Sequence, residues 1–507
     1  MQIIPKRSAL RIKKAAATPS AMLIRRTDVL LIMLDADATV SLANMPFGDV
    51  LTTERARLPR APGSLWTAVL PTAHRTRVIV GELPRHTDTF QRLSVAGRMV
   101  RDLGTTQPGV ITLASLASPH AKGTPNTAPV AALLAALAAI VESQPTAKSK
   151  APPPWQPTEV VVCGVIDTKT ALAIESAAHL ARWLTALPPN VLTPKAYQQA
   201  LVKLAKLHGW KIEVFSEARL KQLKAGAFTA VARGSATRDA ALVRLQYRPK
   251  GTRGLAPLAI VGKGVCFDTG GNNLKSAKHM LDMHTDMAGS AVALGTLEAL
   301  TRSRYPGPVD AWLALVENRI GPDAYTQQDI VTAANGTTIQ VIHTDAEGRM
   351  ILADTLALAS RTKPCAIIDF ATLTGACLYA LTERLSGVFT NHNDLRAILE
   401  DAGNRSGERV WSFPMPTDFD EDLETPMADV VQCLIDGKGD HIYAAKFLSR
   451  FVAPGIPWAH IDLSSASRPT GLAHVSRPIT GFGVRFAVAL CSDPAFHKVI
   501  RSHAQTK

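Results

Sequence analysis

Cysteine is scarce in this chain of 507 residues, and its spacing is irregular. The six cysteines are scattered and form no Cys-x-x-Cys pair, the spacing that is typical of zinc sites and redox motifs. Such usage is typical of a reducing compartment, where thiols serve as small core residues. We therefore expect a cytoplasmic protein.

Long apolar runs are also absent. The longest, from Val130 to Val141, is too short to cross a bilayer, and its alanine content suits a packed helix. The first 27 residues are rich in Lys and Arg and contain no acid, a composition that resembles a transit peptide, but they lack the long apolar segment of a secretory signal. We expect no membrane association and, at residues 1–27, a solvated basic tail in preference to a targeting segment.

Aromatic residues make up only 5% of the chain, and they are not interleaved with the basic residues. A base-stacking platform for single-stranded nucleic acid is therefore not evident, nor is the spacing of a helix-turn-helix or a zinc finger. The net charge of +14 permits binding to polyanions, because a basic surface attracts phosphate and releases counterions. It does not require such binding.

What is present predicts a two-domain α/β protein. The chain is longer than one ordinary core, and 46% of its residues are hydrophobic against 19% charged, which indicates extensive burial. Strand patterns alternate with helix patterns, as in layered α/β folds. We expect a smaller N-terminal α/β domain over residues 1–165 with an exposed proline-rich loop at 144–158, a linker helix and loop over 166–190, and a larger α/β domain over 191–507 with a central mixed sheet flanked by helices.

Several elements can be placed within that frame. Thr193 and Pro194 predict the start of a helix, and Gly209 its end. Further helices are expected near residues 169–184, at 350–359, and from the stretch 283–290 through about residue 300. Strands are expected at 29–34, 77–80, 109–113, 159–165, 211–215, 240–247, 258–262, 309–316, 338–342, 366–370 and 458–463.

The stretch from His343 to Arg349 concentrates charge before an apolar helical pattern. In an extended segment Asp345, Glu347 and Arg349 would face one side, because alternate side chains share a face. Two carboxylates aimed at one point favour a divalent cation as the counter-charge. The alternative is that these acids cap the following helix and interact with its dipole.

A second polar stretch, Gly262 to Lys275, is expected to leave the end of a strand as a loop. Its Gly-x-Gly start suggests nucleotide binding, but Phe267 stands where the third glycine is required, and the phosphate-loop spacing is absent. What remains is glycine freedom around two lysines and an aspartate, at the place where an open α/β sheet carries its functional loop.

Polar side chains thus recur at the ends of predicted elements in the second domain. They are Lys263, Asp268, Lys275, Asp286, Asp345, Glu347 and Arg349, with helix capping as the alternative for Asp286. The charge of the four carboxylates would be balanced by two divalent cations, a pair that activates a shared water for hydrolysis. The cationic side chains would stabilise an anionic transition state. Such ligands suit Mg, Mn and Zn.

Together these segments resemble the leucyl aminopeptidase family, also called the cytosol aminopeptidases or peptidase family M17. The family's most diagnostic motif, Asn-Thr-Asp-Ala-Glu-Gly-Arg, stands here as residues 343–349. Residues 262–275 are similar to its metal and lysine loop, and 283–289 to its third ligand segment. The resemblance covers about residues 171–462. It implies a metallo-aminopeptidase that releases Leu and other apolar residues from peptides with a free N-terminus.

The resemblance also implies a role for each matched residue. One metal would be held by Lys263, Asp268, Asp286 and Glu347, and the other by Asp268, Asp345 and Glu347. Lys275 would polarise the scissile carbonyl, Arg349 would hold a bicarbonate ion as general base, Leu373 would contribute a backbone contact near it, and Met283, Thr372 and Gly375 would form the pocket for the first side chain. The implied cofactors are two ions of Mn or Zn, with Mg or Co also compatible, and the implied assembly is a homohexamer.

The chain departs from the family pattern at His343, which replaces the usual Asn, and at Asn272 and Asn273. We expect His343 to support the site by hydrogen bonding, because the metal ligands are complete without it. The alternative function is that of a DNA-binding or regulatory protein, with or without peptidase activity, because some family relatives bind DNA and this chain is basic. A catalytically silent homologue is disfavoured by the retention of all seven polar positions.

Overall fold

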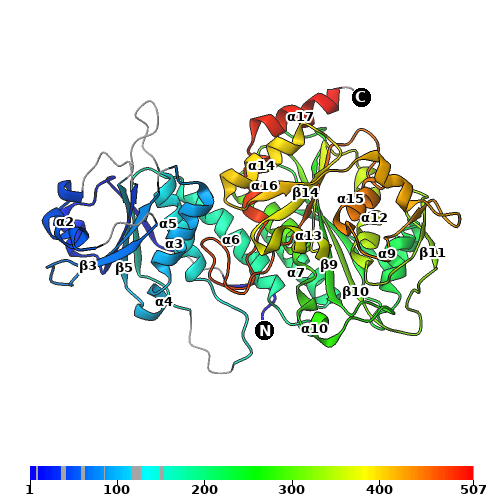
Figure 1. The fold of residues 1–507 in the computed structure, drawn as a ribbon, viewed down its shortest axis with the longest axis horizontal. Helices are drawn as coiled ribbons and strands as arrows, with labels where there is room; N and C mark the ends of the chain where they lie inside the picture. Colours follow the sequence, from blue (N-terminus) through cyan, green and yellow to red (C-terminus); the bar gives the residue numbers. More distant parts are fainter. Residues whose placement is uncertain are drawn as a thin grey trace.

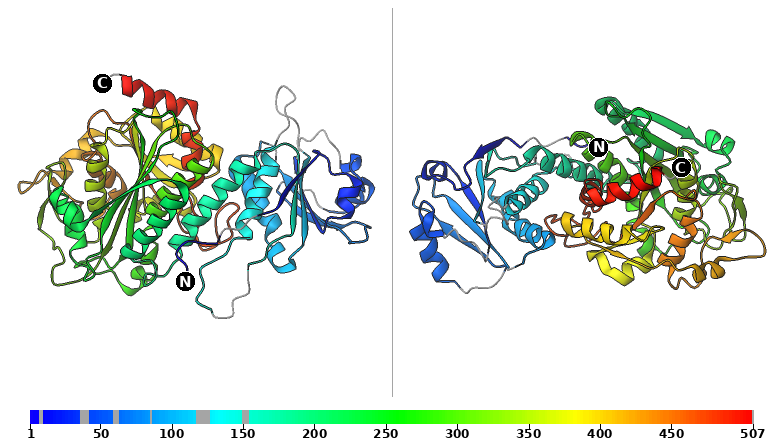
Figure 2. Two further views of the ribbon diagram at one scale, coloured as in Figure 1. Left: turned by 180° about the vertical axis from the view of Figure 1, so that it is seen from behind. Right: turned by 90° about the horizontal axis from the view of Figure 1, so that it is seen from above.

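The computed structural model describes residues 1–6, 10–35, 42–58, 63–84, 86–116, 127–148 and 154–505. Two sheets lie side by side along the longest axis, and helix α6 (Thr168–Thr185) runs between them (Figure 1). Views from behind and from above show helices on both faces of the larger sheet (Figure 2). The predicted α/β fold, with a smaller N-terminal unit and a larger mixed sheet flanked by helices, is confirmed.

The N-terminal sheet has six strands in the order β1-β6-β5-β2-β4-β3. Neighbouring strands are parallel, except that β3 is antiparallel to β4. Its elements are β1 (Ile12–Ala15), α1 (Ala21–Arg25), β2 (Val29–Asp35), η1 (Leu42–Asn44), α2 (Gly48–Ala56), β3 (Leu65–Val69), β4 (Arg77–Leu83), α3 (Thr89–Val100), α4 (Leu103–Thr106), β5 (Val110–Leu116), α5 (Ala128–Ile140) and β6 (Glu159–Cys163).

Both faces of this sheet are covered, which explains the unbroken apolar runs of its central strands. Along β2, Leu31 belongs to the core beneath α3 and α5, whereas Leu30 and Ile32 belong to the core beneath α1 and α2. The expected helix at 130–141 is α5, and the four strands expected between residues 29 and 165 are β2, β4, β5 and β6.

The expectation of a solvated basic tail at residues 1–27 is wrong for the described part of that segment. Strand β1 adds to the edge of the sheet, where Ile12 and Val160 are parallel register partners. Lys13 and Arg26 lie 2.5 and 3.0 Å from the carboxylate of Glu159. Pairing with the unmatched edge of β6 satisfies the backbone, and the acid balances the local positive charge.

The segment between the two sheets follows the prediction in part. The described residues 144–148 and 154–158 contain neither helix nor strand, and residues 149–153 lie outside the described residues. Helix α6 contacts both α5 and α11 (Ala288–Arg302), so it packs against both units. The domain boundaries at residues 165 and 190 remain predictions.

The larger sheet has eight strands in the order β15-β14-β17-β13-β9-β10-β8-β7. Its strands are β7 (Lys211–Ser216), β8 (Ala241–Tyr247), β9 (Leu258–Asp268), β10 (Val309–Asn318), β13 (Ala366–Ala371), β14 (Ser386–Thr390), β15 (Val410–Ser412) and β17 (Trp458–Asp462). The four central strands, β10, β9, β13 and β17, are parallel. Strands β7, β8 and β14 introduce the antiparallel pairings.

Two hydrophobic cores cover the faces of this sheet. One includes residues of α6, α7 (Pro194–His208), α11, α14 (Leu395–Ser406), α16 (Val484–Cys491) and α17 (Pro494–Gln505). The other includes residues of α8 (Glu217–Gln222), α9 (Gly226–Ala232), α12 (Glu347–Ser360) and α15 (Asp440–Ser449). The remaining elements are α10 (Ala277–Met280), η2 (Met283–Thr285), β11 (Ile330–Thr332), β12 (Thr338–Gln340), α13 (Gly375–Leu381), η3 (Thr382–Arg384), η4 (Thr417–Leu423) and β16 (Val430–Val431).

The predicted helix ends at Thr193 and Gly209 are confirmed: the Thr193 side chain accepts from the N–H of Ala196, and Gly209 ends α7 with a positive φ of 69°. The expected end of a strand at Gly262 is wrong. Strand β9 continues to Asp268, because its backbone stays paired with β10 through Val265 and, after a register shift, at Asp268. Among the described helices, none is long and apolar enough to span a membrane.

Candidate active site

The site lies where the carboxyl ends of the parallel strands meet. Asp268 ends β9, Asn318 ends β10, Asp462 ends β17, and Thr372 directly follows β13. Because these strands are parallel neighbours, their carboxyl ends share one edge of the sheet, the usual place for a ligand in an open α/β fold. Glu347, the first residue of α12, reaches the same edge from the helical layer.

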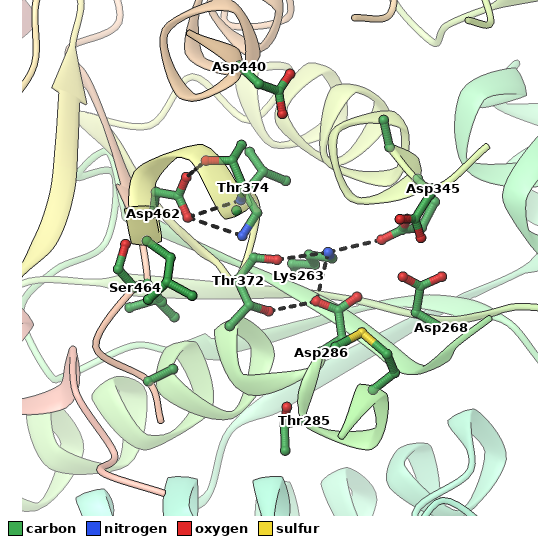
Figure 3. A pocket seen from close by; sticks show the side chains of 18 of the residues that line it. Lys263, Asp268, Thr285, Asp286, Asp345, Thr372, Thr374, Asp440, Asp462 and Ser464 are labelled. Carbon is green, nitrogen blue, oxygen red and sulfur yellow. Dashed lines mark hydrogen bonds and ion pairs between the residues drawn. The ribbon is translucent and has the colours of Figure 1, made fainter. Parts of the chain in front are cut away.

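Lys263 is the centre of the charged cluster. Its ammonium nitrogen lies 2.8 Å from Asp286 Oδ1 and 3.0 Å from Glu347 Oε1, and it donates to the backbone oxygen of Thr372 at 2.9 Å. The side chain is 4% exposed. One lysine therefore ties together β9, the segment before α11, the start of α12 and the loop after β13 (Figure 3).

Lys275 forms the second cationic contact. Its ammonium nitrogen lies 2.9 Å from Asp268 Oδ2 and 2.5 Å from Asp345 Oδ1. Asp268 is fixed from its other oxygen, which accepts from Asn318 Nδ2 and from the N–H of Gly270, both at 2.8 Å. These bonds orient the carboxylate toward the pocket.

Helix capping does not explain the acids of the cluster. The N-cap positions of α12 and α11 are Ala346 and Met287, and neither helix has a side-chain cap hydrogen bond. Asp286 instead accepts from the hydroxyl of Thr372 at 2.8 Å. The expected extended geometry across the motif is also wrong, because Glu347 already belongs to α12. Asp345 precedes the helix, and both acids still reach the cluster.

Burial makes ionisation of the three clustered acids unfavourable. Burial first, and then the neighbouring carboxylates, outweigh the opposing effect of the lysines and raise the pKa of Asp286 to about 6, of Asp345 to about 7 and of Glu347 to about 8. Burial opposes the charged form of Lys263, but Asp286, Glu347 and Asp268 outweigh it, so that the pKa of Lys263 is raised. Without another cation, the lysines and bound protons balance the negative charge.

The donor atoms fit a divalent cation. Ligand oxygens of Asp268, Asp286 and Glu347 lie within 4.8 Å of one another, and all three residues are buried. Among the described residues, no group donates a hydrogen bond to Asp286 Oδ2 or to Glu347 Oε2. Buried oxygens without donors are costly unless a cation binds them, and hard divalent cations prefer oxygen ligands.

A pocket of about 630 Å³ opens onto the cluster. All eleven residues predicted for the site line it: Lys263, Asp268, Lys275, Met283, Asp286, Asp345, Glu347, Arg349, Thr372, Leu373 and Gly375. The structure thus brings the predicted set together. His343 also lines the pocket, and its Nδ1 accepts a hydrogen bond from the N–H of Asp345 at 3.2 Å. This is a supporting hydrogen bond of the kind expected for His343.

Asp462 lines the pocket as well and was not among the predicted residues. It accepts from the hydroxyl of Thr374 at 2.6 Å and from the N–H groups of Leu373 and Thr374 at 3.2 and 3.3 Å. It thereby holds the loop that follows β13 (Figure 3). Its position at the end of a predicted strand was a signal that could have identified it.

Asp440 is the second missed residue. Its two carboxylate oxygens each lie 2.8 Å from Nη2 of Arg349, while Nη1 of Arg349 donates to the backbone oxygen of Gln432 at 3.2 Å. Arg349 is buried, and Asp440 lines the pocket. The stretch Gly437 to Asp440 before an apolar helical pattern gave only a weak signal in the sequence.

Fold and site together define a hydrolase of the metal-dependent class, with acids and lysines gathered at the carboxyl edge of a mixed sheet. Residues 179–488 match the family model described as "Cytosol aminopeptidase family, catalytic domain". The chain therefore belongs to the cytosol aminopeptidase family and is a metallo-aminopeptidase.

Relatives support this assignment. The chain is 40% identical over 347 residues to the probable cytosol aminopeptidase of Parasynechococcus marenigrum (strain WH8102), covering 66% of this chain and 70% of the relative. It is 42% identical over 327 residues to that of Syntrophotalea carbinolica (strain DSM 2380 / NBRC 103641 / GraBd1), covering 63% of this chain and 65% of the relative.

Two solved structures extend the comparison to nearly the whole chain. The bottromycin maturation enzyme BotP in complex with Mn is 31% identical with a TM-score of 0.79, covering 92% of this chain and 99% of that chain. A tomato leucine aminopeptidase mutant is 24% identical with a TM-score of 0.82, covering 96% and 98%, and it shares the fold. These matches include the N-terminal sheet, which the family model does not cover.

Proposed function

We propose that this protein hydrolyses the N-terminal residue from peptides, with a preference for Leu and other apolar residues, using a water that two divalent cations would activate. The observation that carries the proposal is the convergence of four carboxylates and two lysines in one pocket. The single most direct support for metal binding is the buried oxygens of Asp286 and Glu347 that have no donor among the described residues.

The residues present would hold two cations. Lys263, Asp268, Asp286 and Glu347 would bind one, and Asp268, Asp345 and Glu347 the other, with Mn or Zn as the expected ions and Mg or Co also compatible. When bound, such cations act as Lewis acids and lower the pKa of water toward neutrality. Lys263 must lose its proton to bind, and the positive charge of the cations favours that loss.

Lys275 is the side chain of this protein that would stabilise the reacting carbonyl group. Its ammonium lies at the edge of the cluster, and its side chain is 15% exposed, so it can donate to the oxygen of the scissile carbonyl. That oxygen gains negative charge in the transition state, and a fixed donor in a buried site stabilises this charge. Lys275 thus orients the carbonyl for attack.

Selectivity for the first residue would come from the wall of the pocket. Met283, Thr372, Gly375 and Ala466 line one continuous pocket with the charged cluster. A methionine and an alanine contribute apolar surface, and the glycine leaves room for a side chain. The free, neutral α-amine of the substrate would become a ligand of a bound cation, which restricts cleavage to N-termini.

Four further expectations remain predictions. Three of them are a homohexamer, a cytoplasmic location and binding to duplex DNA; the fourth, a bicarbonate ion at Arg349, comes from the family resemblance alone, and its place is considered again below. Sedimentation of the purified protein tests the hexamer, and gel shifts at several salt concentrations test DNA binding, because attraction by the net charge of +14 alone weakens steeply with salt.

The test of the proposed function is an assay over a panel of peptides that differ in the first residue. Protein stripped with a chelator should be inactive and should recover with Mn or Zn, with fastest release of Leu-type residues. Asp345→Ala should abolish the recovery. Full activity of that variant, or activity toward peptides with a blocked N-terminus, would refute the proposal.

A further inference from the structure

Asp440 faces the pocket from α15, away from the clustered acids. In Figure 3 its carboxylate lies at the top of the view, with Lys263 and Asp286 below it and Asp345 to the right. Asp440 is the first residue of α15, and the preceding Gly439 has a positive φ of 61° that turns the chain into the helix. The turn directs this acid to the pocket, where its side chain is 24% exposed.

Arg349 holds this carboxylate in place. Nη2 of Arg349 lies 2.8 Å from both oxygens of Asp440 and has two N–H groups, so both of its donors are engaged. The guanidinium side chain is 2% exposed, and Nη1 already donates to the backbone oxygen of Gln432. A free anion approaching Nη2 would have to displace Asp440 and would meet its negative charge.

We propose that Asp440 is the proton acceptor of the hydrolysis, taking the place that the family resemblance assigns to bicarbonate, so that this enzyme works without a bound bicarbonate. This inference rests on the proposed aminopeptidase activity. A carboxylate clamped by a buried arginine stays in a fixed orientation, which a general base requires, and its partly exposed oxygens remain accessible from the pocket.

Asp440 can account for the proton that moves during the hydrolysis. The oxygen of the attacking water forms a bond to the scissile carbonyl carbon, the carbonyl electron pair moves to its oxygen, and one water proton passes to a carboxylate oxygen of Asp440. When the C–N bond breaks, that proton passes to the leaving amine nitrogen. Asp440 returns to its ionised state, and the released amino acid carries the new carboxyl group.

The kinetic test compares the wild-type protein with Asp440→Ala and Asp440→Asn, each loaded with Mn, in buffer freed of carbon dioxide and with added bicarbonate. Wild-type kcat should be the same in both buffers. Asp440→Ala should lose about 100-fold or more in kcat, the usual range for a general base, with little change in KM. Bicarbonate should restore its kcat at least tenfold, because the vacated site faces Arg349. Asp440→Asn should not respond, because its amide still fills the site.

Asp436→Ala is the matched control, since it removes an exposed acid that contacts Lys438 in the same loop. It should behave as wild type. A second readout is independent of activity: titration with ¹³C-labelled bicarbonate, followed by NMR line broadening, should show binding to Asp440→Ala and none to the wild type. Melting temperatures confirm that each variant is folded.

The outcomes separate this inference from the proposed function. If the Mn-loaded wild type hydrolyses no peptide of the panel, the proposed function fails. If it is active but loses activity without bicarbonate, binds labelled bicarbonate, or keeps its kcat in Asp440→Ala, the role of Asp440 is overturned.

Discussion

The ammonium nitrogen of Lys263 lies 3.0 Å from Glu347 Oε1, which joins a buried residue of β9 to the first residue of α12. The same nitrogen lies 2.8 Å from Asp286. Lys263 is therefore the counter-charge of the cluster when no cation is bound, and in the proposed function it is a neutral metal ligand. Protons and cations compete for the same buried acids.

Lys263→Met should destabilise the metal-free protein. Removing the ammonium leaves Asp286 and Glu347 buried without their cationic partner, a change that costs roughly 3–5 kcal/mol for a buried ion pair. The loss should be larger at pH 8 than at pH 5, because the acids escape the penalty by protonation. Urea unfolding in chelator measures it, with the exposed Lys278→Met as control. Equal stability of Lys263→Met and wild type at pH 8 would contradict this account.

Stabilisation by Mn should increase from pH 6 to pH 8. The pKa values of Asp286, Asp345 and Glu347 are raised to about 6, 7 and 8, above unfolded values near 4. The folded protein therefore binds more protons than the unfolded chain between about pH 4 and 8, and the stability of the metal-free form falls as pH rises through this window. The raised pKa values of Lys263 and Lys275 leave both charged throughout it.

Mn binds the ionised acids, so protons compete with it less near pH 8 than near pH 6. The measurement is the melting temperature with and without Mn at pH 6, 7 and 8. Glu347→Gln, which cannot ionise at that position, should show a smaller and flatter response. A wild-type thermal shift that is the same at all three pH values would count against competition between protons and metal.

Gly348→Ala should weaken metal binding without removing a ligand. A Cβ at Gly348 would lie 2.6 and 2.7 Å from Cε and Nζ of Lys263 and 2.9 Å from Cδ1 of Leu373, closer than packed atoms allow. Lys263 must move away from Glu347. We expect a tenfold or greater rise in the Mn concentration needed for half-maximal activity. Gly104→Ala is the control, and it should have no effect because its Cβ would meet nothing within 4 Å.

Much of the larger sheet was predictable, because its central strands are buried on both faces and appear as apolar runs. The positions at which helices and strands end were harder to predict. The expected loop after Gly262 is strand to Asp268, since pairing with β10 outweighs the flexibility of the glycines. Strands β14 and β15 were not predicted from the sequence: β14 pairs with β17, which is far away in the chain, and β15 joins the sheet only through β14.

The residues of the site were predictable only through the resemblance of three segments to one family. Those segments carry acids and lysines at recognisable spacing. Asp440 and Asp462 lie outside them, and their contacts with Arg349 and Thr374 connect residues 91 and 88 positions apart. Such contacts depend on how α15 and β17 pack, which local sequence patterns do not encode.

Asp462→Asn should impair substrate positioning more than metal binding. An amide has one acceptor oxygen, so it cannot accept from the Thr374 hydroxyl and from both backbone N–H groups as the carboxylate does. The loop after β13 carries Thr372 and Gly375 of the pocket. We expect KM to rise about tenfold, most for large first side chains, while the Mn requirement stays near that of the wild type. Thr374→Ser, which keeps the hydroxyl, should be mild, and Thr374→Val should resemble Asp462→Asn.

Lys275→Ala should separate catalysis from metal binding. Lys275 contacts Asp268 and Asp345, yet the proposed ligand set is complete without it, so thermal stabilisation by Mn should persist. Loss of one fixed donor to a developing oxyanion costs roughly 10²–10³ in kcat. Steady-state kinetics with saturating Mn measure this, and Lys278→Ala, an exposed lysine nearby in the sequence, should keep wild-type kcat. If Lys275→Ala instead loses the Mn-induced thermal shift and regains its activity at higher Mn concentration, Lys275 serves the metal site and does not polarise the substrate.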